Sequence, residues 1–271
     1  MNLKVLFVTQ EIIPYMPETK MAKICRILPQ GIQEKKNEIR TFMPKFGCIS
    51  ERRNQLHEVI RLSGMNIIIN DIDYPLLLKV ASVQTARIQF YFIDNDMFFF
   101  RKYKFRNEDE NIDYQDNDER AIFFTRSVIE TVKKLSWKPD IIHCHGWFSA
   151  LIPFFMKKIY NNEPLFTDKP KIIYSIYENE KFDTLNKDIS KKISNIEIKQ
   201  EDISLLQNPT WENLNKFAIN YSDGVIFTEN NPDEQLQNFT INTKKIFLPN
   251  VEMENIVKKY QEFYEQMHHN K

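Results

Sequence analysis

The chain has 271 residues, of which 42% are hydrophobic, enough for one large or two small globular domains with a buried core. Its 37 lysines and arginines equal its 37 aspartates and glutamates, so no overall field attracts nucleic acid or an acidic membrane, and we exclude both as partners. Three cysteines without CxxC spacing, and an N-terminal apolar run that ends at Thr9, indicate no disulfide framework, secretory signal or membrane span, so we expect a cytoplasmic protein.

Short apolar runs bounded by turn residues recur along the chain, and each has the length of a strand buried on both faces. In chain order they are Lys4–Val8, Ile39–Met43, Ile88–Ile93, Ile141–His143, Lys171–Ile176 and Gly224–Phe227. Helical patterns lie between several of them, at Met21–Lys35, at Asp116–Leu135, and from an N-cap at Asn208 followed by Pro209 as far as Tyr221. Strands that alternate with helices predict an α/β fold, a Rossmann-like parallel sheet with helices on both faces.

Three segments depart from this alternation. Residues 56–93 alternate apolar and polar side chains, which predicts a small antiparallel β insertion ahead of the central helix. Residues 181–207 are polar and predict a mobile, loop-like excursion. Residues 251–271 predict one amphipathic helix, whose Ile256, Tyr260 and Phe263 dock on the core while His268 and His269 fray in solvent.

The stretch DIIHCHGWF, from Asp140 to Phe148, places two histidines at the end of a predicted strand. Successive side chains of a strand point to opposite faces, so His143 and His145 share a face while Cys144 points away. Two ligands on one side do not complete a zinc site without a third from elsewhere, and no HxxxH or CxxC pattern accompanies them, so we expect no metal. Because ligands of parallel sheets bind beyond the carboxyl ends of the strands, the pair is a candidate hydrogen-bonding floor for a polar ligand.

Other chemical signals are weaker. Cys144 lies in no reactive-cysteine signature, so we interpret it as an inert apolar filler. Asp118, Glu119 and Arg120 open the predicted central helix, and we interpret them as capping groups and surface ion pairs. The chain has five glycines and no GxGxxG or GxxxxGK pattern, so we expect no cofactor cradled by a phosphate-binding loop.

Several ordered motifs resemble the N-terminal, catalytic-type domain of bacterial glycogen and starch synthases, retaining family 5 glycosyltransferases of the GT-B fold that use ADP-glucose. VLFVTQEIIPY resembles its opening strand, RTFMPKFG its second strand, and YFIDND followed by FFFR its sugar-site loop. DNDERAIFFTRSVIE and WKPDIIHCHGWFSALIP resemble its most specific part. The resemblance implies a domain over residues 1–250 and a terminal helix over 251–271, and we expect the second GT-B domain to be absent because the chain ends just past FLPNVE.

The first departure from the family lies after the opening strand. The family carries a Lys-Thr-Gly-Gly-Leu loop there, which holds the donor's phosphate end and the acceptor. This chain reads PETKM, with Pro17 at the lysine position and Thr19 and Lys20 at the glycine positions. A proline supplies no charge, and the two added side chains crowd a site that the family builds from bare backbone.

Two further departures affect the sugar side of the family's site. Gly146 stands where the His-x-His-Asp-Trp motif has its functional aspartate, so only His143, His145 and Trp147 remain of that motif. Tyr177 and Glu178 replace a His-Asn pair that lies near the transferred sugar in the family. The resemblance therefore implies a degenerate active site.

We predict a glycogen or starch synthase-like pseudoenzyme that is inactive alone and binds an α-glucan or a protein partner, a second copy of the chain included. The candidate substrate-binding residues, by motif position, are Lys20, Arg101, His143, His145 and Trp147, and we predict no catalytic residue. One alternative is a glycosyltransferase subunit, transferring from ADP-glucose to α-1,4-glucan, that a separate donor-binding chain completes. Another is a scaffold without a ligand. A salt bridge between Lys20 and Glu178 is predicted to close the altered pocket.

Overall fold

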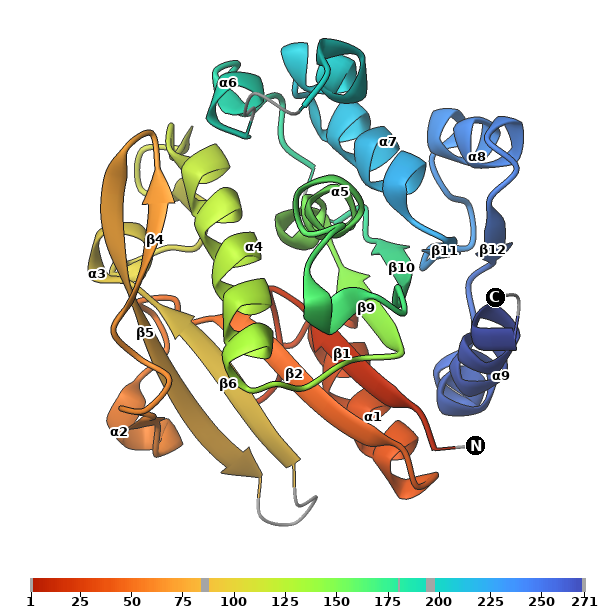
Figure 1. The fold of residues 1–271 in the computed structure, drawn as a ribbon, viewed down its shortest axis with the longest axis horizontal. Helices are drawn as coiled ribbons and strands as arrows, with labels where there is room; N and C mark the ends of the chain where they lie inside the picture. The colour runs from red at the N-terminus through yellow and green to blue at the C-terminus, as the bar shows by residue number, and fades with distance from the viewer. Residues whose placement is uncertain (1, 84–87, 180, 194–197, 270–271) are drawn as a thin grey trace.

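A mostly parallel sheet runs through the molecule, as the computed structural model shows for residues 2–83, 88–179, 181–193 and 198–269 (Figure 1). The strand order is β12-β11-β10-β9-β1-β2-β6-β5-β3, with β4 paired to β5. The parallel strands are β1 (Lys4–Val8), β2 (Glu38–Pro44), β6 (Ile88–Asp94), β9 (Ile141–His145), β10 (Lys171–Ile176), β11 (Gly224–Phe227) and β12 (Ile246–Leu248). The predicted fold class is confirmed, and the six predicted strands lie within two residues of their observed bounds.

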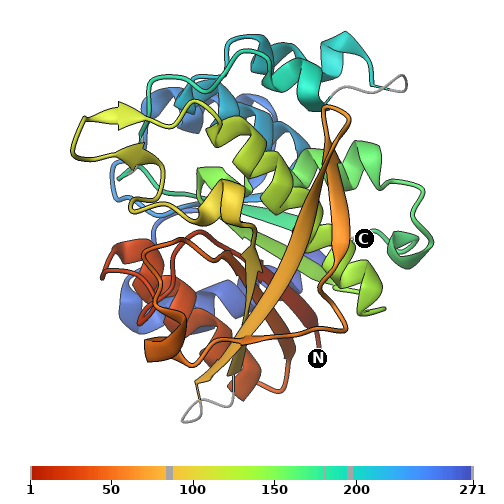
Figure 2. The same cartoon turned by 90° about the vertical axis from the view of Figure 1, so that its left-hand side faces the viewer.

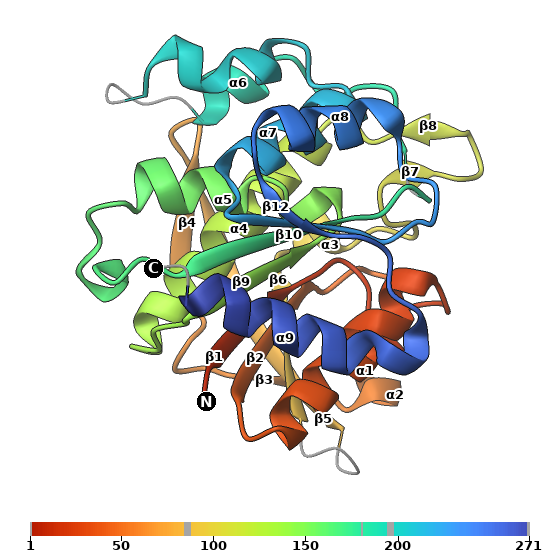
Figure 3. The same ribbon diagram turned by 90° about the vertical axis from the view of Figure 1, so that its right-hand side faces the viewer.

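Helices cover both faces of the sheet because each has an apolar stripe that must be buried. Figure 3 shows α1 (Lys20–Glu34) and α9 (Ile256–His269) on one face, with α4 (Asn117–Lys134), α5 (Ile152–Phe154) and α7 (Trp211–Tyr221) on the other. The remaining helices and helical turns are α2 (Glu51–Asn54), α3 (Asp96–Phe99), η1 (Trp147–Ser149), η2 (Phe155–Ile159), η3 (Pro164–Phe166), α6 (Ile189–Ile193), η4 (Gln200–Gln207), α8 (Glu234–Asn242) and η5 (Met253–Asn255). Among the described residues, no helix is both long enough and apolar enough to cross a membrane.

The order of the strands places a topological switch beside β1. The strands β2 and β6, which come first in the chain, lie on one side of β1 in the sheet. The later strands β9, β10, β11 and β12 lie on its other side. Ligands of open α/β sheets bind at such a switch, beyond the carboxyl ends of the strands. The segments after β1 and β9, which carry Lys20 and Trp147, both leave the sheet at this point.

The predicted start of α7 was wrong. The helix is capped by Thr210, whose hydroxyl accepts a hydrogen bond of 3.2 Å from the backbone N–H of Asn213. Thr210 has extended backbone angles, so Asn208 and Pro209 lie before the helix and not at its cap and first turn. Thr19 plays the same part for α1, because its hydroxyl accepts a hydrogen bond of 3.0 Å from the N–H of Ala22.

The predicted β insertion is part of the main sheet and not a separate unit. Its strands β3 (His57–Glu58), β4 (Met65–Ile69) and β5 (Ile72–Val83) form antiparallel pairs, and β5 pairs with β6. However, β6 also pairs in parallel with β2, so the antiparallel strands extend the sheet. Figure 2 shows the β4–β5 hairpin rising beside α4, against which β4 packs.

The predicted docking of the terminal helix is confirmed, although η5 precedes it and α9 begins only at Ile256. Ile256, Tyr260 and Phe263 are buried. Gln261 accepts a hydrogen bond of 2.9 Å from Asn37, and Val257 lies where a side chain at Gly31 would be, so α1 and α9 pack closely. The helix continues through the exposed His269 instead of fraying at His268, and residues 270–271 lie outside the described residues.

The polar stretch after β10 is more ordered than its composition indicates. It forms α6 and η4, and it buries Ile189, Ile193, Ile203 and Leu206. The prediction of a loop-like excursion was therefore wrong for these parts, because sparse apolar side chains at helical spacing are enough to dock them. Residues 194–197 of the predicted excursion lie outside the described residues.

Candidate functional site

A pocket of about 440 Å³ lies between two excursions from the carboxyl end of the sheet. One wall is the small hairpin of β7 (Arg106–Asn107) and β8 (Ile112–Asp113) with its flanks, and the other is the segment that follows β10. The lining residues are Lys104, Phe105, Arg106, Glu108, Asp113, Tyr114, Gln115, Asn117, Trp147, Asn179, Lys181, Phe182, Asp183, Thr184, Leu185 and Asn186. The lining thus combines aromatic rings with amides and carboxylates.

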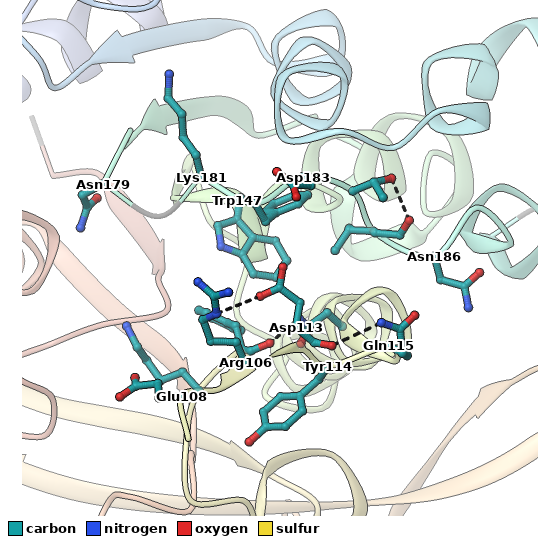
Figure 4. Close-up of a pocket in the computed structure, with 16 residues that line it drawn as sticks. Arg106, Glu108, Asp113, Tyr114, Gln115, Trp147, Asn179, Lys181, Asp183 and Asn186 are labelled. Carbon is teal, nitrogen blue, oxygen red and sulfur yellow. Dashed lines mark hydrogen bonds and ion pairs between the residues drawn. The ribbon is translucent and has the colours of Figure 1, made fainter. Parts of the chain in front are cut away.

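Trp147 forms the floor where the two walls meet. It begins η1 directly after Gly146, whose φ of 76° ends β9. Its ring lies 4.7 Å from that of Phe105, 4.9 Å from that of Phe182 and 5.2 Å from that of Phe148, centroid to centroid, and the residue is only 4% exposed. Figure 4 shows Arg106 of the hairpin paired with Asp113, at 3.3 Å, and it labels Asp183 among the residues of the other wall.

His143 and His145 share a face of β9, as predicted, but neither lines the pocket. His143 bonds the hydroxyl of Tyr264 on α9 at 2.6 Å and that of Ser175 at 2.7 Å, while Nδ1 of His145 bonds the hydroxyl of Tyr177 at 3.0 Å. Burial lowers the pKa of His143 well below its ordinary value and that of His145 to about 3. Both rings are therefore neutral members of the core, and their predicted role toward a ligand stays a prediction.

Cys144 points to the other side of β9, as its position in the strand predicts. The residue is fully buried, and burial raises the pKa of its thiol. An inert filler is the role that these properties support. In the ranges that the structure describes, no three His, Cys, Asp or Glu side chains are grouped so that they could hold a metal ion.

Lys20 and Glu178 do not form the predicted salt bridge. The ammonium group of Lys20 donates to the backbone oxygen of Thr228 and lies 3.5 Å from Glu229 and 3.3 Å from the side-chain oxygen of Asn250. Glu178 instead pairs with Lys181 at 3.1 Å and accepts a hydrogen bond from a backbone N–H at the start of α8. The prediction failed because Lys20 opens α1 pointing toward the end of β11, a direction that the sequence does not encode locally.

The segment PETKM, which leads from β1 into α1, makes contacts within the protein. Thr19 caps α1 and also donates a hydrogen bond to the buried carboxylate of Glu11, which is paired with Lys104. Pro17 is exposed. A side chain at Gly146 would come within 2.6 Å of the Met21 methyl group and 2.9 Å of the Gln10 side-chain oxygen, so the backbone here is closed against larger residues.

The polar residues around α4 are more buried than predicted. Asp118 is fully buried and pairs with Lys192 of α6 at 2.7 Å, so the interpretation as surface ion pairs was wrong for it. Arg120 is also fully buried, donates to the backbone oxygen of Phe98, and has its pKa lowered to about 9 by burial and then by Arg101. Arg101 pairs with Asp116 through two hydrogen bonds of 2.5 and 2.7 Å, beside the pocket and outside its lining.

The residues that sequence reasoning missed are Phe105, Phe182 and Lys181. They lie in irregular segments without hydrophobic periodicity, and only the fold brings them into one pocket with Trp147. A family motif pointed to Trp147, but no pattern in the chain pointed to its neighbours.

Comparison with known proteins identifies the family. A sequence model of the starch synthase catalytic domain matches residues 4–244. Glycogen synthase of Chlorobium limicola is 36% identical over 178 residues, which are 65% of this chain and 36% of that protein. Glycogen synthase of Chlorobium luteolum is 38% identical over 165 residues, 61% of this chain and 34% of that protein. The match thus spans about a third of the length of these curated relatives.

A solved structure supports the fold independently. The catalytic domain of starch synthase IV from Arabidopsis thaliana, bound to ADP and acarbose, superposes with a TM-score of 0.73 at 17% identity. The superposition covers 93% of this chain and 52% of that one. The chain belongs to the starch synthase catalytic domain family.

Proposed function

We propose that this domain binds α-glucan chains in the pocket beside Trp147 and does not transfer glucose on its own. The observation that carries the proposal is the lining of the pocket, in which aromatic rings lie next to amide and carboxylate side chains. Sugar rings present apolar C–H faces that pack on aromatic rings, and their hydroxyl groups exchange hydrogen bonds with amides and carboxylates. The acarbose bound to the Arabidopsis relative makes α-glucosidic oligosaccharides the first ligands to test.

The absence of independent transfer is supported by what the donor-side residues contact. Lys20 and Thr19 are engaged within the protein, and Pro17 carries no charge for a phosphate group. The two histidines are buried and neutral. Transfer requires groups that stabilise the charge developing on the departing nucleotide, and none of these five residues is placed to do so.

The binding half of the proposal is tested by calorimetric titration of the whole chain with maltoheptaose. Asp183 is exposed and lines the same pocket as Trp147 (Figure 4), so Asp183→Ala is expected to weaken binding by about tenfold without loss of folding. Glu110→Ala is the matched control, because this exposed carboxylate belongs to the β7–β8 turn and does not line the pocket. Equal affinities for the wild type and both variants would place the glucan elsewhere, and no heat with any of them would remove the function.

A further inference from the structure

The aromatic floor of the pocket is covered by the protein's own side chains. Trp147 is only 4% exposed. Of the rings that contact it, Phe105 at 4.7 Å and Phe182 at 4.9 Å line the pocket, whereas Phe148 at 5.2 Å does not. A sugar ring stacks only on aromatic surface that it can reach. Stacking on Trp147 therefore requires one of the two phenylalanines to move.

The two phenylalanines differ in how firmly they are held. Phe105 also packs against Phe46 at 5.4 Å and Phe148 at 5.1 Å, which joins it to the core. For Phe182, Trp147 is the one aromatic ring in contact among the described residues. Phe182 is therefore the cover that can leave at the smaller cost in buried apolar surface.

The residue before Phe182 forms two ion pairs. The ammonium group of Lys181 lies 3.1 Å from Glu178 and 3.1 Å from Asp233, and 4.5 Å from the centre of the Trp211 ring. Glu178 also accepts a hydrogen bond of 2.7 Å from the backbone N–H of Asp233, so it links Lys181 to the start of α8. This clamp, Lys181 with Glu178 and Asp233, joins the side chain of the residue next to Phe182 to the start of α8.

We propose that Phe182 is an autoinhibitory plug, which occupies the sugar-stacking position on Trp147 and is held there by the clamp of Lys181 with Glu178 and Asp233. The inference rests on the proposed glucan function and adds how access to the same pocket is controlled. Glu178, which differs from the residue that the family has at this position, is then a positioning residue that acts on Phe182 through Lys181.

The proposal predicts that loss of a contact improves binding. Glucan binds only molecules in which Phe182 has left Trp147, so the apparent Kd equals the intrinsic Kd divided by the open fraction. Weakening the clamp raises that fraction. Phe182→Ala and Lys181→Met are each expected to lower the Kd for maltoheptaose by about three- to tenfold and to raise the association rate.

The matched control is Lys187→Met, which makes the same chemical change at an exposed lysine of the same segment outside the pocket lining. It is expected to leave the Kd unchanged. Glu178→Gln is a second clamp variant in case Lys181→Met unfolds α8, because its amide oxygen still accepts from the N–H of Asp233 while the attraction for Lys181 falls. It is expected to lower the Kd in the same direction.

A readout without ligand separates this inference from the proposed function. Acrylamide quenching of Trp147 fluorescence, obtained by subtracting a Trp147→Phe background, is expected to rise in both clamp variants and to stay unchanged in Lys187→Met. Increased quenching without maltoheptaose binding to any variant would remove the glucan function and leave the plug. Unchanged quenching in both clamp variants, or weaker binding by Phe182→Ala, would overturn the plug.

Discussion

The rings of His143 and His145 lie 3.8 Å apart, centroid to centroid, and both residues are fully buried. Hydroxyl groups of Tyr264 and Ser175 satisfy both nitrogens of His143, and that of Tyr177 satisfies one nitrogen of His145. The family's histidine pair thus serves here as a joint between β9, β10 and α9.

This joint predicts a pH dependence of stability. Folding lowers the pKa of both histidines, that of His145 to about 3, whereas the unfolded chain titrates near the ordinary value of about 6.5. As the pH falls below about 6.5, both histidines become protonated in the unfolded state while they stay neutral in the folded state. The free energy of unfolding that is present above that pH is therefore lost as the pH falls toward 3. Each histidine contributes a slope of up to about 1.4 kcal/mol per pH unit.

Urea unfolding between pH 7 and pH 4 measures this slope. His145→Asn is expected to reduce the slope, because the unfolded state of this variant takes up one proton fewer. His57→Asn changes an exposed histidine of β3 and is expected to keep the wild-type slope. If the free energy of unfolding of the wild type does not fall between pH 7 and pH 4, the two histidines are not buried in the neutral form.

Gly146 is predicted to be required by the backbone. Its φ of 76° with ψ of 169° is a conformation that side chains disfavour, and an added Cβ would meet Met21 and the Gln10 oxygen, which accepts a hydrogen bond of 3.1 Å from the N–H of Phe148. Gly146→Ala should lower the free energy of unfolding by about 2 to 4 kcal/mol. Gly64→Ala is the control, since Gly64 has a φ of 78° and open space around it, and it should cost about 1 to 2 kcal/mol. Equal losses at the two glycines would show that the contacts of Gly146 carry no energy.

The docking of α9 is predicted to depend on one hydroxyl group. Tyr264→Phe removes the partner of the His143 Nδ1 atom in a fully buried place, so it should lower the free energy of unfolding by about 1 to 3 kcal/mol. Tyr103→Phe removes a hydroxyl that bonds Asp109 at an exposed site and should change stability by less than about 0.5 kcal/mol. Thermal or urea unfolding of the two variants measures both losses. Equal losses would show that the buried hydrogen bond of Tyr264 contributes no more to stability than an exposed one.

The parts of this fold that could be predicted are those governed by burial. Strands such as Lys4–Val8 and Lys171–Ile176 are apolar on both faces, so their bounds follow from the sequence. Strand β12 was missed because it has three residues at the edge of the sheet, with Ile246 and Phe247 each more than a third exposed. A short edge strand carries no periodic signal.

The candidate site was predictable only in part, for a related reason. Trp147 follows a buried strand at the topological switch, where a local motif and a general rule agree. The contacts of Lys20 with Thr228, of Lys181 with Asp233 and of Phe182 with Trp147 join segments far apart in the chain, so no local pattern predicts them. The buried state of Asp118 likewise depends on Lys192, which lies 74 positions later.

The central claim is that this domain binds α-glucan without transferring glucose. The most direct test is a calorimetric titration of the purified chain with maltoheptaose in the presence of ADP-glucose, followed by assay of ADP in the same cell. We expect a saturable binding heat and no ADP above that of a protein-free blank. Release of ADP together with lengthened oligosaccharides would contradict the account, and so would the absence of any binding heat.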